Sequence, residues 1–529
     1  MVPWAEPAGA VPLDDEAWYE ISSPHFTVVS GAGRSQARSI ARDLERLRWA
    51  LGGLTNLELL SPVPIRVYVF PNDRAFQPYK HLYHGAPATM SGAFYARADL
   101  DVLTLHGARG GEARLTVQHE YVHAVLRNNL PGLPLWLEEG LAELYSTFEV
   151  VSGKPRLGRA IPWHLRTLKK GTLLPLADLL AADTASALYQ EFDDQGMFYA
   201  RAWELVHHLF ERPGSGHRQA FAYAAQVRRG VDPEAAFRRA FGQEPAALER
   251  ALGEHRGERY SPRIPGLGPL PSPPLEERRL DYGELLYLLG DLLLSQGGRR
   301  DDAAFHFEQA LARAERQRAE GLAGHSRDLP RWVGRAAAGL GGLEAAAGDY
   351  AAARGRYRRA LELSPRDPAL AFRYGASLLI LGRATSDAKR VEARRYLERS
   401  LGAEPDFVPA WDALRLATRL DQASMASLDG RLRERPETVL GLMVLYARQG
   451  RAGEARRLRS LLPEEASVGG VRGWGQRADD LLERLRWLAG EGPAELQLLR
   501  SSSTEPMAAD PPSSEAGEAA PGSDRIPAM

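Results

Sequence analysis

The chain has 529 residues, no cysteine and a formal net charge of −1 at pH 7. Its length is sufficient for roughly three to four domains, and the lack of cysteine excludes both a disulfide framework and a cysteine-based zinc site. A charge this close to zero gives no support to nucleic acid or an anionic membrane as an obligate partner.

The sequence also bears on location. It has no apolar run of the length that a membrane helix needs, so we expect no transmembrane segment. The first residues lack the basic and apolar regions of a signal peptide. We therefore expect a cytoplasmic location by default, and a periplasmic or cell-envelope location if the start of the chain is misplaced.

Strand and helix patterns alternate in the N-terminal part. Residues 1–20 are expected to form an extended lead-in, and residues 25–30 and 64–70 have the pattern of strands. Between these strands, residues 35–51 carry apolar side chains at helical spacing. Asp73 is then predicted to cap a short helix.

Two more strands are predicted at residues 92–96 and 101–105, joined by a polar turn. We expect them to form the antiparallel end of a small mixed sheet. This sheet would lie directly before the stretch with the clearest chemical signal in the chain.

That stretch is a pair of histidines, His119 and His123, separated by one helical turn within residues 115–126. Residues four apart share one face of a helix, so both imidazoles can bind one Zn²⁺ while Glu120 points to its open position. A third protein ligand is needed, and residues 135–145, which have the pattern of a second helix, supply carboxylates. A buried histidine pair that is only hydrogen-bonded is the structural alternative.

Residues 119–145, with H-E-x-x-H followed by W-L-E-E-G-L-A-E, resemble the gluzincin metallopeptidases, the class that includes thermolysin, and are most similar to peptidase MA-like domains. The resemblance implies one Zn²⁺ per chain, bound by His119, His123 and Glu139, with Glu120 as general base. It also implies an α+β zincin-like domain with a small mixed sheet, active-site helices and a helical C-terminal lobe.

The third ligand has an alternative, because the loop after His123 is shorter here than in thermolysin. Glu139 is preferred over Glu138 since it precedes Gly140 and leaves Glu143 on its own face. Glu138 is then expected to be a solvated neighbour. Glu143 is expected to steady a ligand histidine, because a ligating imidazole normally donates its second N–H to a carboxylate or carbonyl.

The resemblance implies two further roles. The strand with Leu103 and Thr104 would border the cleft and pair with extended substrate backbone; an ordinary sheet strand is the alternative. Tyr199, in the Tyr-Ala-x-x-Trp stretch of a predicted helix, would stabilise the developing oxyanion; a packing role is the alternative.

The peptidase-like domain is expected to span residues 21–258 and to end at a proline-rich linker, residues 259–276. Residues 277–465 contain degenerate repeats in which a glycine on a first helix is followed by alanine and a large side chain on a second. The best examples are Gly290, Phe307 and Ala310; Gly341, Tyr357 and Ala360; and Gly375, Ala393 and Leu397.

This pattern resembles tetratricopeptide repeats and implies an all-α superhelix with a concave face suited to a peptide or protein partner. A generic array of helical hairpins is the alternative. Residues 466–499 are expected to contain a closing amphipathic helix, and residues 500–529 a disordered tail.

The sequence therefore predicts a zinc-dependent metallopeptidase that acts on peptides or proteins and carries a protein-binding repeat module. The alternative is a repeat-based scaffold with an inactive or structural metal domain. A weaker one is a zinc hydrolase of a non-peptide bond, because the same metal chemistry serves other carbonyl substrates.

Overall fold

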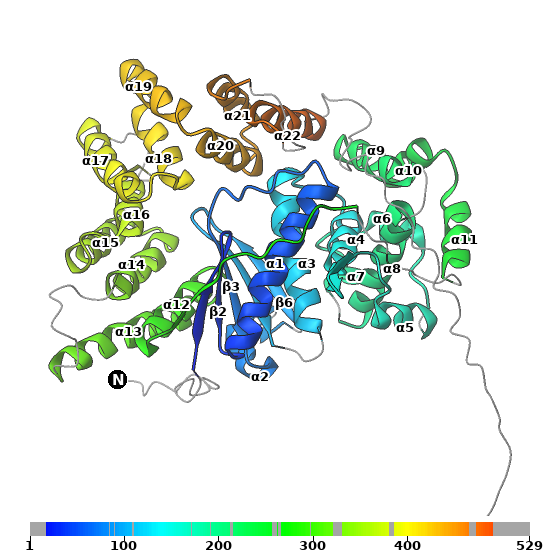
Figure 1. Cartoon of the computed structure of the whole chain (residues 1–529), viewed down its shortest axis with the longest axis horizontal. Helices are drawn as coiled ribbons and strands as arrows, with labels where there is room; N and C mark the ends of the chain where they lie inside the picture. Colours follow the sequence, from blue (N-terminus) through cyan, green and yellow to red (C-terminus); the bar gives the residue numbers. More distant parts are fainter. Residues whose placement is uncertain are drawn as a thin grey trace, which may run out of the picture.

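The computed structural model describes residues 17–489 apart from residues 84, 89, 108–110, 171, 191, 212–214, 257–261, 263–265, 297, 321–330, 380–385, 420 and 465–471. Most of the predicted lead-in, part of the linker and the whole predicted tail therefore lie outside the described residues. The described part is a mixed α/β structure with one six-stranded sheet and many helices (Figure 1).

The sheet has the strand order β10-β1-β2-β3-β7-β6. Its strands are β1 (Tyr19–Ser22), β2 (Phe26–Ser30), β3 (Ile65–Phe70), β6 (Gly92–Ala96), β7 (Asp101–His106) and β10 (Glu276–Arg279). β2, β3 and β7 are parallel, and the remaining pairs are antiparallel. The predicted mixed sheet with an antiparallel end at β6 and β7 is confirmed.

Helices cover both faces of this sheet because its strands alternate two sets of apolar side chains. Val28, Val67 and Leu103 share a core with α1 (Arg34–Leu54) and α3 (Glu112–Asn129). Val29, Tyr68 and Val102 point to the opposite face and pack against α12 (Tyr282–Leu294) and the helices that follow it. The sheet thus holds α3, which carries the histidine pair, against a rigid surface.

A short segment follows β3, with α2 (Asp73–Phe76), a 3₁₀ helix η2 (Gln77–Tyr79) and the hairpin β4 (Leu82–Tyr83) and β5 (Ala86–Pro87). The predicted cap of α2 is wrong by one residue. The side chain of Asn72 accepts the hydrogen bond from Ala75 N, and Asp73 is the first residue of the helix.

The helix predicted to carry the third ligand, α4 (Leu135–Ser146), packs against α3 and against α8 (Phe192–Glu211). Gly140 allows the second contact, because a Cβ at this position would lie 2.4 Å from Val206 Cγ2 and 2.5 Å from Ala202 O. The rest of this helical lobe comprises the hairpin β8 (Glu149–Val151) and β9 (Lys154–Arg156), then α5 (Pro162–Lys170), α6 (Leu176–Ala181), α7 (Ala187–Gln190), α9 (Gly216–Arg228), α10 (Pro233–Phe241) and α11 (Pro245–His255).

After the linker the chain returns to the sheet. Glu276–Arg279 forms the edge strand β10 beside β1, and α12 covers one sheet face. The segment predicted to begin the separate repeat region at residue 277 therefore belongs to the six-stranded sheet. The sheet and the helices that follow β10 share a hydrophobic core at this point.

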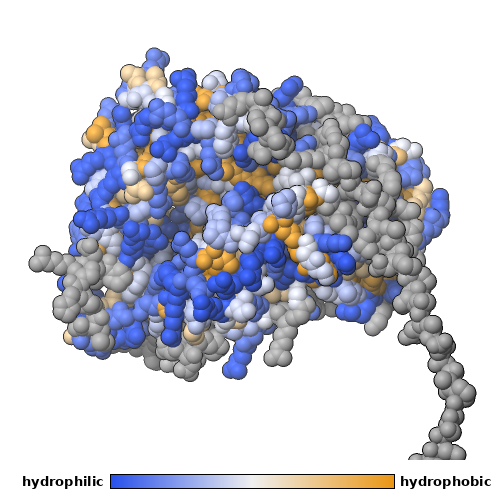
Figure 2. Space-filling view, in the orientation of Figure 1, coloured by the Kyte–Doolittle hydropathy of each residue, from blue (hydrophilic) through white to orange (hydrophobic). Residues whose placement is uncertain are grey.

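The following helices pack in consecutive pairs, α12 with α13, α14 with α15, α16 with α17, α18 with α19, and α20 with α21. Their bounds are α13 (Arg300–Ala319), α14 (Arg331–Ala346), α15 (Tyr350–Leu363), α16 (Pro368–Leu379), α17 (Asp387–Ala403), α18 (Val408–Thr418), α19 (Gln422–Arg433), α20 (Pro436–Arg448), α21 (Ala452–Leu458), the 3₁₀ helix η3 (Arg459–Leu461) and α22 (Trp474–Leu488). Hydrophilic residues cover much of the visible face of these pairs (Figure 2).

The small residues of the predicted repeats stand at close helix contacts. A Cβ on Gly290 would lie 2.8 Å from Phe307, one on Gly341 would lie 3.1 Å from Tyr357, and one on Gly375 would lie 3.0 Å from Leu397. The same contact thus recurs in three successive helix pairs. None of the helices in the described ranges combines the length and the apolar character needed to cross a membrane.

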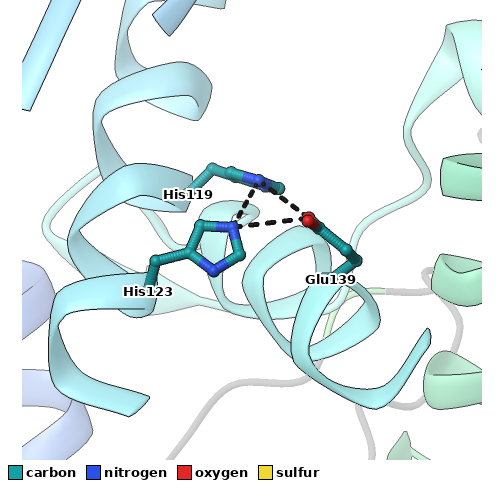
Figure 3. A group of neighbouring side chains, drawn as sticks. All are labelled: His119, His123 and Glu139. Carbon is teal, nitrogen blue, oxygen red and sulfur yellow. Dashed lines mark hydrogen bonds and ion pairs between the residues drawn. The ribbon is translucent and has the colours of Figure 1, made fainter. Parts of the chain in front are cut away.

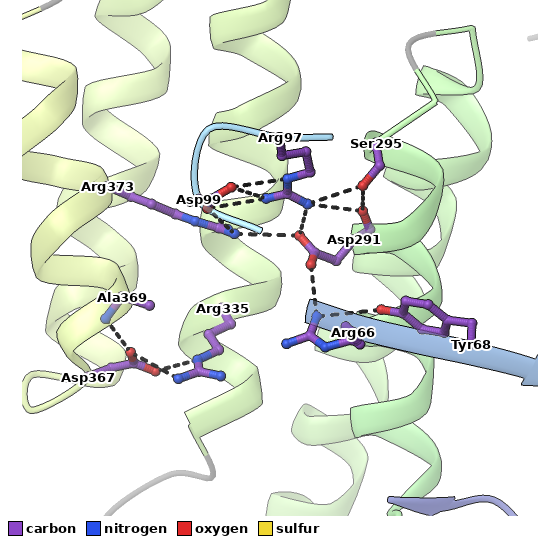
Figure 4. A network of polar contacts seen from close by, with 10 residues as sticks. All are labelled: Arg66, Tyr68, Arg97, Asp99, Asp291, Ser295, Arg335, Asp367, Ala369 and Arg373. Atoms are coloured by element: carbon purple, nitrogen blue, oxygen red, sulfur yellow. Dashed lines mark hydrogen bonds and ion pairs between the residues drawn. The ribbon is translucent and has the colours of Figure 1, made fainter. Parts of the chain in front are cut away.

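The helix pairs form an arc around the sheet, and charged side chains fill part of the space between them (Figures 1 and 4). Asp291 of α12 pairs with Arg97 of the β6–β7 turn at 2.9 Å and with Arg66 of β3 at 3.1 Å. Arg373 of α16 reaches Asp99 of the same turn at 3.3 Å. Part of the surface expected to bind a protein partner is therefore covered by the chain's own sheet.

The last described helix, α22, contacts the N-terminal region, between α1 and β3. Arg477 of α22 makes two hydrogen bonds, of 2.6 and 2.8 Å, to the buried carboxylate of Glu58. The backbone of Glu58 exchanges two hydrogen bonds with the side chain of Asn129, the last residue of α3. Helix α22 is therefore connected to the end of the helix that carries the histidine pair.

Candidate metal centre

The two histidines of α3 project to the same point (Figure 3). His119 and His123 lie one turn apart, and their Nε2 atoms are 3.0 Å from each other. Their side chains are 15% and 14% exposed, so solvent or a small ligand can reach them from one side.

Glu139 of α4 completes this cluster, as predicted in preference to Glu138. Its Oε2 atom lies 3.3 Å from Nε2 of His119 and 3.3 Å from Nε2 of His123. The residue is 3% exposed, and its Oε2 atom faces both imidazoles. Three donor atoms from two helices thus converge on one small volume.

The spacing of these atoms fits a bound zinc ion. Tetrahedral ligands about 2.0–2.1 Å from Zn²⁺ lie about 3.3 Å from one another, and the three distances here are 3.0, 3.3 and 3.3 Å. The donor set of two imidazoles and one carboxylate is also one that zinc accepts.

A carboxylate lies beside the other nitrogen of each histidine ring. His119 Nδ1 lies 3.6 Å from Glu143 Oε1, and His123 Nδ1 lies 3.2 Å from Glu138 Oε1. A proton on Nδ1 would leave Nε2 free to bind a cation. Glu138, which was expected to be a solvated neighbour, is 32% exposed and is also hydrogen-bonded to His123 Nδ1.

Sequence reasoning gave no role to His164 of α5, whose Nε2 lies 3.2 Å from Glu143 Oε2. It is 3% exposed and packs against Trp203 of α8. Nothing in the local pattern of α5 distinguishes it from other helical histidines. The contact arises only because α4, α5 and α8 meet.

The opposite charges of the imidazoles and the carboxylates shift one another's pKa values. Burial alone would raise the pKa of Glu139, but the facing imidazoles hold it far below its usual value. Burial lowers the pKa of His123, and Glu139 and Glu138 outweigh this and raise it well above normal. A cluster whose carboxylate favours positive charge in this way suits a cation.

Glu120 lies beside the start of strand β6. A Cβ on Gly92 would be 3.3 Å from Glu120 Oε1, 2.5 Å from Thr116 Cγ2 and 2.9 Å from Thr104 O. Only glycine fits there without displacing its neighbours. Burial, the largest effect, raises the pKa of Glu120, and a nearby metal cation would oppose that shift.

The predicted substrate strand is wrong. Leu103 and Thr104 lie in β7, are fully buried, and have both sides of their strand paired, with β3 and with β6. No edge of β7 is left to which a peptide could add. Among the described strands, the open edge beside the metal centre belongs to β6.

Two tyrosines border the cluster on the side of α8. The ring centroid of Tyr199 lies 6.2 Å from that of His119, so the predicted oxyanion residue is near the site. Tyr189 of α7 donates a hydrogen bond of 2.9 Å to Glu139 Oε1. No sequence pattern points to Tyr189, because it lies in a helix of only four residues, fifty residues away from Glu139.

No model of a known protein family matches this chain, and no curated protein matches it. The interpretation of the metal centre therefore depends on its own geometry. That geometry places three donor atoms, a carboxylate at their side and an open strand edge in one region.

Proposed function

We propose that this protein is a zinc-dependent metallopeptidase that hydrolyses peptide bonds with water. The observation that carries the proposal is the triangle of His119 Nε2, His123 Nε2 and Glu139 Oε2, whose sides of 3.0–3.3 Å match a tetrahedral zinc site. The number of donors supports a catalytic rather than a purely structural ion. The group in the described residues has three donors, whereas a structural zinc site is normally closed by a fourth protein ligand. Glu120 lies on the same helix as the two histidines.

The zinc ion, when bound, supplies Lewis acidity to a water molecule and to the substrate carbonyl. Glu120 accepts the proton of the attacking water and delivers it to the departing amine. Tyr199 donates its hydroxyl hydrogen to the oxygen that gains charge. Glu143 and Glu138 hold the two imidazoles so that both Nε2 atoms stay directed at the metal.

The substrate is an extended peptide segment that pairs with strand β6. Gly92, at the start of β6, lies beside Glu120, so a backbone bound along this edge passes the general base. Main-chain hydrogen bonds to a strand edge hold a peptide independently of its sequence. This arrangement favours a peptide over a small non-peptide substrate.

The test compares the purified protein with two variants. Wild type is expected to contain about one zinc per chain and to cleave an unfolded protein substrate such as casein. Glu120→Gln should retain the metal and lose activity by about 10²–10⁴-fold, because it removes a general base. His123→Ala should lose both metal and activity.

Hydrolysis by Glu120→Gln at the wild-type rate would sink the proposal, and so would a wild type that stays free of zinc after zinc is added. A repeat-based scaffold with an inactive metal domain predicts that Glu120→Gln changes no property of the protein. The two functions are therefore separated by one variant.

A further inference from the structure

The two oxygens of Glu139 have different surroundings. Oε2 faces the Nε2 atoms of the two imidazoles, each at 3.3 Å. Oε1 accepts the hydrogen bond from the Tyr189 hydroxyl at 2.9 Å. One oxygen is thus left for a cation, and the other is held by a phenol.

Tyr189 also lies beside Tyr199, with ring centroids 6.1 Å apart. A phenol has one hydrogen to donate. Tyr189 gives its hydrogen to Glu139 Oε1, so it cannot also donate to Tyr199.

Local structure fixes the position of Tyr189. Helix α7 begins at a turn in which Asp183 Oδ1 accepts hydrogen bonds from Ser186 Oγ at 2.8 Å and from Ala185 N at 3.0 Å. The ring of Tyr189 packs edge-on against Phe198 of α8 at 5.7 Å. The phenol is therefore directed at Glu139 by both the helix start and the core.

We propose that Tyr189 is a positioning residue for the metal centre: it holds Glu139 by Oε1, so that only Oε2 binds the metal. This inference rests on the proposed function. A carboxylate held in this way binds through one oxygen, which keeps a coordination position open for water and substrate. Without Tyr189 the carboxylate is free to rotate.

The test is Tyr189→Phe, which removes only the hydroxyl. Tyr223→Phe is the matched control, because Tyr223 is a buried phenol in the same lobe that donates to a backbone oxygen, Leu180 O, at 3.0 Å. Zinc affinity is measured by competition with a chromophoric chelator, and thermal unfolding is measured on the metal-free proteins. Both variants are expected to lose similar stability without metal.

The two variants should differ in their affinity for zinc. Tyr189→Phe is expected to bind zinc about 10–100-fold more weakly, the usual effect of removing a group that supports a ligand, whereas Tyr223→Phe should bind it as wild type does. Tyr199→Phe should keep the zinc affinity and lower kcat about 10²–10³-fold, as loss of an oxyanion donor does.

A folded Tyr189→Phe variant with wild-type zinc affinity would overturn the inference and leave the proposed function standing. A wild type that binds no zinc would instead refute the proposed function itself. The two failures are therefore distinguishable in the same titration.

Discussion

At the scale of single residues, two adjacent glutamates of α4 have different expected roles. Glu139 Oε2 lies 3.3 Å from both Nε2 atoms, whereas Glu138 Oε1 meets only Nδ1 of His123, at 3.2 Å. Adjacent residues on a helix point in different directions, so one carboxylate can serve as a ligand while its neighbour supports a ring.

We predict that Glu139→Gln abolishes zinc binding, because it removes a ligand. Glu138→Gln should only weaken zinc binding by about 10–100-fold, because it removes the support of one imidazole. Zinc titration of both purified variants checks this. Equal losses in the two variants would contradict the division of roles.

Sequence reasoning places correctly the two residues whose spacing is local. His119 and His123 lie four residues apart, so helical spacing alone predicts that they share a face, and the structure brings their Nε2 atoms to 3.0 Å from each other. Tyr189 and His164 could not be found in this way. Their contacts with Glu139 and Glu143 depend on how α5, α7 and α8 pack on α4, and no local pattern records that packing.

At the scale of elements, the distance between α4 and α8 is set by Gly140. A side chain at this position would meet the backbone of α8 at Ala202 O, 2.5 Å away, and backbone cannot move aside as a flexible side chain can. Because α4 carries Glu139 and α8 carries Tyr199, this contact also sets the spacing of two groups in the metal centre.

We predict that Gly140→Ala destabilises the protein by about 1–3 kcal/mol, the usual cost of overpacking. Gly196→Ala, in α8, is the matched control, since a Cβ there would meet nothing within 4 Å. That change should instead stabilise the helix by about 0.5–1 kcal/mol. Urea unfolding of both variants measures the difference, and destabilisation by Gly196→Ala of the same size would remove the explanation.

The predicted elements match the structure best where the apolar pattern is strong, as in β3 and α1. Strand β10 was missed because its sequence, Glu276-Glu277-Arg278-Arg279, contains no apolar residue. Charged edge strands of this kind protect a sheet against unwanted pairing, but they also hide the strand from any hydrophobic pattern. The substrate strand was misplaced for a related reason: the order of β6 and β7 in the sheet is a property of tertiary packing.

At the scale of the whole molecule, α22 connects the C-terminal helix pairs with the N-terminal region that contains the sheet and the candidate metal centre. Arg477 pairs with Glu58, which is 2% exposed, and Arg228 of α9 donates to Leu488 O at the end of α22 and to Pro131 O in the α3–α4 connector. Trp487 lies in the hydrophobic core that also contains residues of α1, α3 and α4, and its ring is edge-on to Phe221.

We predict that Arg477→Ala destabilises the protein by about 3–5 kcal/mol, because it removes both of its charge-assisted hydrogen bonds to the buried Glu58 carboxylate, which keeps a hydrogen bond from Leu60 N. Asp479→Ala, which breaks an exposed ion pair with Arg459 in the same region, should cost about 0–1 kcal/mol. Burial raises the pKa of Glu58, but the bonds from Arg477 outweigh it and hold that pKa below normal.

A lowered pKa means that the pair stabilises the fold above the ordinary pKa of glutamate and loses this effect as the pH falls. The difference between wild type and Arg477→Ala should therefore be largest near pH 7 and shrink in acid, as measured by urea unfolding at several pH values. A difference that is constant with pH would show that Glu58 is not the group responsible.

The position of α22 in the chain has a consequence for synthesis on the ribosome. The metal ligands emerge early, but the helix whose Arg477 reaches the end of α3 is translated more than three hundred residues later. At common elongation rates this delay is on the order of tens of seconds. The growing chain thus carries the candidate metal centre without the support of α22 until that helix has itself been translated.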